Sequence, residues 1–429
     1  MNIALTARLS LMMFVQYFIW GCWAPTLGNF MGTEGVNMGE LIPVAYSLGP
    51  ISCIIAPFFL GMVADRFFDS EKVLGILCLI AGAAMMAMPA YAGTALFLPL
   101  LFLHALCYFP TLGLTASLAF HHMTNQEKEF PVVRVFGTIG WVVAGFLIGK
   151  FLIEGSDADP VYIGRASLYF GGAAAVFLGL YSFSLPLTPP PARGQKSSWR
   201  EILGVDALKE LNTRSSMVFL ISAMLIFIAF GTYFPYAPRY LSAVSGGEPI
   251  FSAFPDYIPF SIPAFEMAFG QASEIIFMLL IPFFFARLGI KWMLMMGMLA
   301  WVARFTLFAG AALTGTFWVI MLGIVIHGIC YDFFFVTGQI YLDKRTSRSI
   351  RGQAQGLLVL LTQGVGMFLG AQLSGAFVNT IGEGGTLTPV DWRLFWGVFA
   401  AATLVFALAF FVFFKDDTES RTSNTHQGV

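Results

Sequence analysis

The stretch IHGICYDFFF, residues 326–335, places an aspartate in the middle of a segment that is otherwise long and apolar enough to cross a membrane. An ion at the centre of a bilayer costs about 2.5 to 3.5 kcal/mol on insertion scales, so such residues usually face a protein interior or a wet cavity and carry function. His327 and Tyr331 are spaced i and i+4 and share one helix face, with Asp332 one residue further round. The stretch therefore predicts a membrane helix that carries a polar cluster on a transport path.

The composition of the whole chain indicates a polytopic membrane protein. Of its 429 residues, 58% are hydrophobic and 11% are charged, against about 25% charged residues in a soluble domain. The net charge of −1 argues against a nucleic-acid partner, because nucleic-acid binders carry clustered basic faces. The sequence contains no His-Glu-x-x-His motif, nucleophile elbow or phosphate-binding glycine loop, so it does not support an enzyme, a metal site or a cofactor.

Apolar segments divide the chain into two similar groups. Since about 20 apolar residues span a bilayer, we predict membrane helices at 9–31, 41–64, 73–92, 95–120, 133–153 and 166–187, and again at 217–241, 262–286, 292–313, 317–341, 354–379 and 394–414. Between the groups lies the longest polar interval, 188–214, whose part 199–211 has the spacing of an amphipathic helix on the membrane surface. We therefore expect twelve transmembrane helices.

A weak internal repeat relates the two groups. The segment RVFGTIG at 134–140 and the segment RGQAQG at 351–356 each follow a polar loop and open a helix rich in glycine. Two six-helix bundles joined by a cytoplasmic linker are the parallel-repeat plan of a major facilitator transporter, whose substrate site lies near the bilayer midplane between the halves. We expect an N-terminal bundle at 1–187, a linker at 188–214, a C-terminal bundle at 215–415 and a cytoplasmic tail at 416–429.

The segment GMVADR at 61–66 resembles the signature that this superfamily carries in the loop between its second and third helices. The resemblance implies that Asp65 and Arg66 form a charged latch that gates the cytoplasmic side. Ordinary helix capping at a solvated turn is the alternative.

Lysine and arginine predict the orientation of the chain. With an even number of helices both termini share one side, and that side also collects most of the basic residues, including those of the central loop. The opposite side has only Lys150, Arg165, Arg239 and Arg393. Both termini are therefore expected in the cytoplasm.

Acidic residues within apolar segments are the strongest candidates for transport chemistry. Glu274 follows Gln271 by three positions, so both lie on one face of the eighth helix, where Asp332 of the tenth is expected to meet them. Burial favours a protonated carboxyl and a nearby arginine favours the carboxylate, so a carboxyl whose arginine contact changes can take up and release a proton. We predict Glu274 and Asp332 as the proton-coupling residues. The alternative is a static ion pair with Arg134 or Arg304.

Two further pairs are spaced to share a helix face. Arg134 and Thr138 lie at i and i+4 on the fifth helix, and Gln16 and Trp20 do so on the first. An aromatic ring beside an amide can stack on a planar ligand ring. Packing is the alternative for Trp20, and Arg304 is expected to neutralise a neighbour within the second half.

Several blocks together resemble the bacterial nucleoside:proton symporter family of the major facilitator superfamily. They are FVQYFIWGCW (14–23), YFPTLGL (108–114), FPVVRVFGTIGW (130–141), LGVDAL (203–208), QASE (271–274) and HGICYDFF (327–334). The resemblance implies a monomeric carrier in the bacterial cytoplasmic membrane that binds a nucleoside and protons between its halves. It implies Arg134, Thr138, Gln271, Glu274, His327, Tyr331 and Asp332 as positions that match the family's site.

The seventh helix departs from this resemblance. Where nucleoside permeases of the family carry an amide pair, this chain has Gly231 and Phe234. Each lost amide removes hydrogen bonds worth about 0.5 to 1.5 kcal/mol net. The alternatives are therefore a carrier of this fold for sugars or another small polar solute, and a sensor of this fold that no longer transports.

Overall fold

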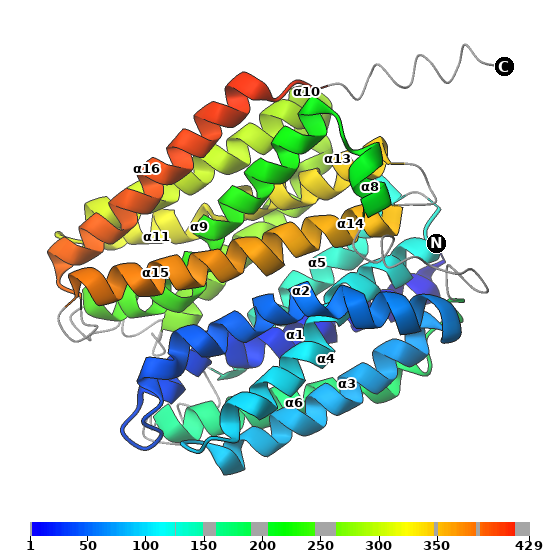
Figure 1. Cartoon of the computed structure of the whole chain (residues 1–429), viewed down its shortest axis with the longest axis horizontal. Coiled ribbons are helices and arrows are strands. Elements are labelled where there is room, and N and C mark those ends of the chain that lie inside the picture. Colours follow the sequence, from blue (N-terminus) through cyan, green and yellow to red (C-terminus); the bar gives the residue numbers. More distant parts are fainter. Residues whose placement is uncertain are drawn as a thin grey trace.

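The chain folds into two helical bundles that lie side by side. The computed structural model describes residues 2–124, 126–148, 160–189, 205–244, 263–346, 351–382 and 387–416, without the side chains of 56–67 and of a few residues at helix ends. In Figure 1 the N-terminal bundle, blue to cyan, lies below the C-terminal bundle, green to red. Across these described ranges the regular structure is entirely helical. The predicted all-α fold is confirmed.

The N-terminal bundle contains six long helices. They are α1 (Ile3–Gly32), α2 (Ile42–Phe67), α3 (Ser70–Ala87), α4 (Phe97–His121), α5 (Gln126–Leu147) and α6 (Pro160–Ser182), with the short 3₁₀ segments η1 (Gly39–Leu41) and η2 (Met88–Tyr91). The prediction for the fifth helix began too late, at residue 133. Polar residues fill the first turn of α5, and a search for apolar runs does not detect helical turns outside the bilayer.

The C-terminal bundle has more interruptions. It comprises α9 (Arg214–Val244), α10 (Pro263–Ala311), α11 (Phe317–Val325), α12 (His327–Tyr331), α13 (Thr337–Arg345), α14 (Arg351–Val359), α15 (Met367–Ile381) and α16 (Pro389–Phe413). Two π-helical segments, η5 (Asp332–Val336) and η6 (Leu360–Gly366), join α12 to α13 and α14 to α15. The short α8 (Val205–Glu210) precedes α9 and is the described part of the helix predicted at 199–211.

The number of membrane crossings agrees with the prediction. Ten stretches of the described chain are helical, long and apolar enough to cross a bilayer. One of them, Glu266–Ala311, has 46 residues and turns at Gly289, whose φ of 68° is left-handed, so it supplies two crossings. With α2 added, the described helices account for the twelve predicted crossings. The start of α1 and the end of α16 lie at the same end of the bundle (Figure 1).

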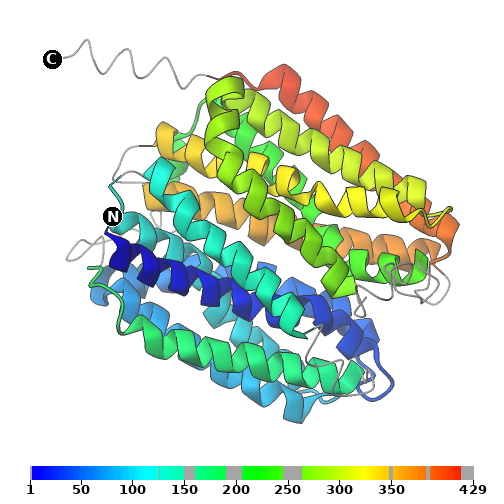
Figure 2. The same cartoon turned by 180° about the vertical axis from the view of Figure 1, so that it is seen from behind.

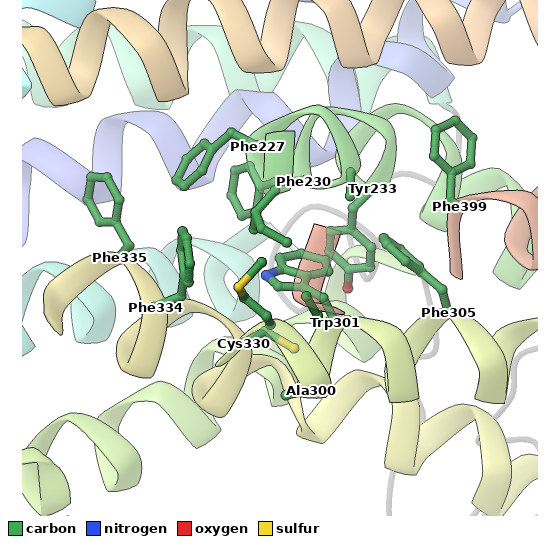
Figure 3. Close-up of a cluster of buried hydrophobic side chains, with 14 of the residues drawn as sticks. Phe227, Phe230, Tyr233, Ala300, Trp301, Phe305, Cys330, Phe334, Phe335 and Phe399 are labelled. Carbon is green, nitrogen blue, oxygen red and sulfur yellow. The ribbon is translucent and has the colours of Figure 1, made fainter. Parts of the chain in front are cut away.

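Each bundle has its own apolar core. The C-terminal core is rich in aromatic rings, and Figure 3 shows Phe230, Tyr233 and Trp301 packed together at its centre. Phe234 of α9 contacts both this core and the core of the N-terminal bundle. Large apolar side chains are also exposed on the outside, such as Leu180 at 62% and Trp318 at 72%, as expected of a surface that faces lipid rather than water.

The fifth helix connects the bundles because it contacts both of them. α5 packs against α1 within its own half and against α10 of the other half (Figure 2). Gly140 makes the close approach of α1 and α5 possible, since a Cβ at this position would lie against the backbone carbonyl of Phe14. Small residues at such contacts are typical of membrane helices.

We predict that Gly140→Ala destabilises the protein by about 1 to 3 kcal/mol, the usual cost of forcing extra atoms into a packed contact. The measurement is the thermal midpoint of the purified protein in detergent. Gly113→Ala in α4 is the control, because nothing lies within 4 Å of a Cβ built there. Equal midpoints for the two variants would contradict this account of the packing.

Candidate functional site

A cavity lies between the two bundles and is lined by both. Its volume is about 50 Å³, room for only a few water molecules. The N-terminal half contributes Tyr17, Trp20, Arg134, Thr138 and Trp141, and the C-terminal half contributes Phe227, Phe230, Phe234, Gln271, Glu274, His327, Tyr331, Gln363 and Met367. The polar members come from α5, α10, α12 and η6, so four separate segments of chain meet here.

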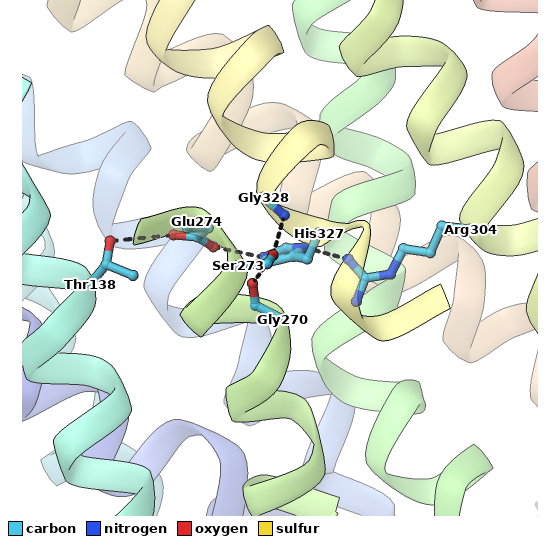
Figure 4. Close-up of polar contacts among 7 residues, drawn as sticks. All are labelled: Thr138, Gly270, Ser273, Glu274, Arg304, His327 and Gly328. Atoms are coloured by element: carbon cyan, nitrogen blue, oxygen red, sulfur yellow. Dashed lines mark hydrogen bonds and ion pairs between the residues drawn. The ribbon is translucent and has the colours of Figure 1, made fainter. Parts of the chain in front are cut away.

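Glu274 joins the two halves across this cavity. One carboxylate oxygen, Oε2, accepts a hydrogen bond of 3.4 Å from the hydroxyl of Thr138 on α5, and the other, Oε1, lies 3.0 Å from Nε2 of His327 on α12. Figure 4 shows the side chains in a row that runs from Thr138 through Glu274 and His327 to Arg304. A change in the charge of Glu274 therefore acts on both halves at once.

His327 has a second partner on the side away from the cavity. Its Nδ1 is hydrogen-bonded to Nη1 of Arg304. The side chain of Arg304 is fully buried, and its Cζ atom lies 3.6 Å from the centre of the Tyr233 ring. Arg304 does not line the cavity. Its hydrogen-bond partner does lie in the second half, as expected, but it is a histidine, so the expected neutralisation of an acidic neighbour is not what this contact provides.

A break in the tenth membrane helix positions His327. α11 ends at Val325, Ile326 has a ψ of −4°, and α12 begins at His327. The N–H of Gly328 donates to the hydroxyl of Ser273 on α10 at 2.9 Å, and that hydroxyl donates to the carbonyl of Gly270 at 2.6 Å. These bonds fix the start of α12 against α10. The membrane segment predicted at 317–341 is confirmed as the span Phe317–Arg345, and the turn at Ile326 lies within it.

Asp332 is buried beside the cavity without lining it. Neither of its carboxylate oxygens has a hydrogen-bond partner in the described structure, although Glu274 and Arg134 lie within electrostatic range. The residue opens the π-helical segment η5, and such segments occur frequently at functional sites. Here the static ion pair that was the alternative for Asp332 does not form.

Three polar atoms at the cavity also lack a hydrogen-bond partner among the described residues. They are Nη1 of Arg134, Oε1 of Gln271 and Oε1 of Gln363. The Arg134 guanidinium lies 4.0 Å from the centre of the Tyr17 ring, which holds it without using its N–H groups. Because an unpaired buried polar group costs about 1 to 3 kcal/mol, the three groups are placed to bind a ligand that offers both acceptors and donors.

Aromatic rings form the remaining walls of the cavity. Trp20 and Trp141 are in edge contact, with ring centres 5.2 Å apart. On the opposite half Phe230 contacts Phe234 at 5.1 Å and Tyr331 at 5.9 Å. Large flat apolar surfaces with a few polar groups between them are suited to a planar ligand ring.

Most of the predicted substrate residues come together in this cavity. Its lining includes Trp20, Arg134, Thr138, Gln271, Glu274, His327 and Tyr331. Gln16 lies elsewhere: its amide donates to the hydroxyl of Thr111 at 2.7 Å within the N-terminal core. The side chains of Asp65 and Arg66 lie outside the described residues, so their gating role stays a prediction.

Comparison with known proteins gives the site its context. The sequence profile of the family described as Nucleoside H+ symporter matches residues 1–419. The chain belongs to that family. Its relatives in Escherichia coli (strain K12) include the protein YegT, 35% identical over 426 residues, and nucleoside permease NupG, 31% identical over 423 residues; each alignment covers 97% of this chain and 96% of the relative.

Solved structures agree with this family assignment. The crystal structure of a mutant of the nucleoside transporter NupG matches with a TM-score of 0.77 and 29% identity, covering 96% of this chain and 100% of that chain. The POT family transporter PepTSo shares the fold alone, with a TM-score of 0.70 and 14% identity over 95% of this chain and 98% of that chain. The protein is thus a multi-pass membrane transporter rather than an enzyme, as the sequence predicted.

Six of the fourteen residues that line the cavity were not predicted from the sequence. They are Tyr17, Trp141, Phe227, Phe230, Gln363 and Met367. Gln363 left a detectable signal, because it is an amide inside the apolar helix 354–379. The phenylalanines left none: the chain has 46 of them, and nothing in their spacing separates cavity rings from core rings.

We predict that Ser273→Ala destabilises the protein by about 1 to 3 kcal/mol, because it leaves the buried N–H of Gly328 without an acceptor. The measurement is again the thermal midpoint. Ser52→Ala is the matched control, since the Ser52 hydroxyl donates only to the carbonyl of Leu48 in its own helix. A Ser273 variant as stable as the control would show that the break before α12 does not depend on this bond.

Proposed function

We propose that this protein imports nucleosides together with protons across the bacterial cytoplasmic membrane by alternating access. The observation that carries the proposal is the cavity between the halves, where unpaired donors and acceptors face aromatic walls. Membership of the Nucleoside H+ symporter family and the relationship to nucleoside permease NupG support the same cargo.

The lining suits the two parts of a nucleoside. The base would stack against Trp20, Trp141 or the phenylalanines of α9, while its polar edge and the ribose hydroxyls bond to Arg134, Gln271 and Gln363. Arg134 supplies N–H donors only, and each amide supplies both donors and an acceptor. These contacts reach both halves, so a bound nucleoside would hold the halves together.

The cavity is too small for a nucleoside in this conformation. A volume of about 50 Å³ is well below the roughly 300 to 1,000 Å³ of typical ligand pockets. Binding therefore requires the walls to move apart, which a rocking motion of the two halves provides. The single long bond between Thr138 and Glu274 is a contact that such a motion can break and remake.

Two carboxyl groups would couple this motion to protons. Asp332 has no donor to its oxygens in this conformation, and a buried unpaired carboxylate is costly, so we assign it a proton here. When the halves move, contact with Arg134 would favour the carboxylate and release the proton. Protonation of Glu274 would alter its bonds to Thr138 and His327, and would therefore affect both halves.

The direction of transport follows from the proposed orientation. The side proposed to hold both termini also carries most lysine and arginine residues, which supports a cytoplasmic position for it. Proton entry from outside would then drive import. We propose that the carrier is complete as a monomer, because the described cavity is lined by residues of one chain.

The test is counterflow in liposomes with radiolabelled uridine, adenosine and several sugars. Saturable exchange of a nucleoside supports the proposal. Saturable sugar exchange without any nucleoside exchange would replace it with a sugar carrier of the same fold. Binding of a nucleoside without flux under an imposed pH gradient would indicate a sensor.

We predict that Asp332→Asn and Glu274→Gln each abolish accumulation driven by a pH gradient, while at least one of them still exchanges substrate. The amide cannot carry a proton but keeps the size and polarity of the side chain. Accumulation and exchange of labelled nucleoside in proteoliposomes measure the two effects separately. Glu40→Gln, at an exposed carboxyl, is the control. Normal accumulation by both site variants would exclude the proposed proton role.

A further inference from the structure

Arg304 is a buried charge that neither the cavity nor the proton pathway explains. Its side chain is fully buried, and its guanidinium lies over the Tyr233 ring at 3.6 Å, with Trp301 and Phe308 at 5.3 and 5.7 Å. Its one hydrogen bond in the described structure goes to Nδ1 of His327. Burying a cation among aromatic rings costs more free energy than burying an apolar side chain of similar size, so a role beyond packing is expected.

The bond between these two residues fixes where the imidazole carries its proton. A guanidinium has only N–H donors and no acceptor, so Nδ1 of His327 must be the unprotonated nitrogen. A neutral imidazole then carries its proton on Nε2, which lies 3.0 Å from Oε1 of Glu274. The ring therefore donates to the carboxylate, and it cannot take a second proton while Arg304 stays in place.

We propose that Arg304 is a positioning residue that keeps His327 neutral, with its proton on Nε2, so that the imidazole always donates to Glu274. This role rests on the proposed function, since it makes Glu274 rather than His327 the group that gains and loses a proton at this point. It also links a guanidinium outside the cavity to the carboxylate inside it.

The other groups around His327 leave this assignment intact. From α9 the ring faces Tyr233 at 5.6 Å and Phe230 at 6.3 Å, and from its own helix it faces Tyr331 at 6.2 Å. From α10 it faces Trp301 at 6.0 Å, besides Glu274 and Arg304. Arg134 of α5 and Asp332 of η5 interact electrostatically with Glu274 or with each other rather than with the ring. The two charged side chains that act on the imidazole are thus Arg304 and Glu274.

Loss of the guanidinium should create an extra proton site. With Arg304 replaced by methionine, Nδ1 is free to bind a proton, and the resulting imidazolium would pair with the Glu274 carboxylate. The rate of exchange would then depend on the titration of one more group. That group can change the rate by up to about tenfold per pH unit. Lysine, which also has donors and no acceptor, should preserve the original behaviour.

The direct test is a ¹⁵N NMR spectrum of the full-length protein labelled at histidine, because it reads the ring nitrogens without any substrate. The chain has five histidines, and the signals missing from His327→Gln assign those of His327. We expect one protonated and one unprotonated ring nitrogen from mildly acidic to mildly alkaline pH, and a second protonation at the acidic end only in Arg304→Met. A wild-type ring protonated on Nδ1, or an Arg304→Met spectrum identical to wild type, would overturn the proposal.

The functional test uses the pH profile of nucleoside counterflow. Arg304→Met should change the profile and Arg304→Lys should restore it. In the His327→Gln background Arg304→Met should add no further change, because glutamine donates to Glu274 but does not titrate. An equal change in both backgrounds would show a merely structural role. If the methionine variant does not fold, Arg304→Gln replaces it, since an amide that both donates and accepts no longer fixes the proton on Nε2.

The NMR and counterflow measurements distinguish a failure of the role of Arg304 from a failure of the proposed nucleoside transport. A wild-type protein that exchanges no nucleoside would refute the nucleoside cargo, while the NMR measurement would still decide the state of His327. Normal exchange together with an imidazolium in the wild-type spectrum would refute the role of Arg304 and leave the transport proposal in place.

Discussion

One carboxylate in the cavity bonds to both halves of this transporter. Glu274 accepts a hydrogen bond from Thr138 of the N-terminal half, while its other oxygen faces Nε2 of His327 in the C-terminal half. The break before α12 and the buried Arg304 both serve to place that imidazole. The bond to Thr138 is long, at 3.4 Å, so it is weak and contributes little to holding the halves together.

Much of the fold was predictable because a bilayer permits few structures. Backbone groups in hydrocarbon must be satisfied internally, which leaves helices as the spanning element of an apolar chain of this kind. The same constraint made the charged candidate residues detectable, since Arg134, Glu274 and Asp332 lie within otherwise apolar segments. The bilayer constraint could not identify the aromatic walls of the cavity, because phenylalanine occurs in apolar cores, on lipid-facing surfaces and in cavities alike.

Helical periodicity succeeded for one pair of residues and failed for their neighbour. The i, i+4 spacing of His327 and Tyr331 placed both at the cavity, as a regular helix requires. Asp332 was expected to join them but is turned away from the cavity and opens a π-helical segment. Asp332 lies about 100° further round the helix than Tyr331, so it leaves the face that His327 and Tyr331 share. The break before α12 is a separate feature, and it comes from tertiary packing. A Cβ at Gly328 would lie 2.8 Å from the Ser273 carbonyl, so glycine brings α12 against α10 there and the helix breaks just before it. Sequence spacing alone does not contain this information.

The two residues singled out on the seventh membrane helix differ in their relation to the cavity. Gly231 of α9 does not reach the cavity; a Cβ there would lie 2.7 Å from the carbonyl oxygen of Met367, so the residue serves the packing of α9 on α15. Phe234 does reach the cavity and offers an aromatic ring there. Gln363 supplies an amide from η6 instead. A neutral hydrogen bond contributes only about 0.5 to 1.5 kcal/mol net. Under the proposed function, the position of an amide would therefore affect which atoms of the nucleoside are recognised more than how tightly the nucleoside is held.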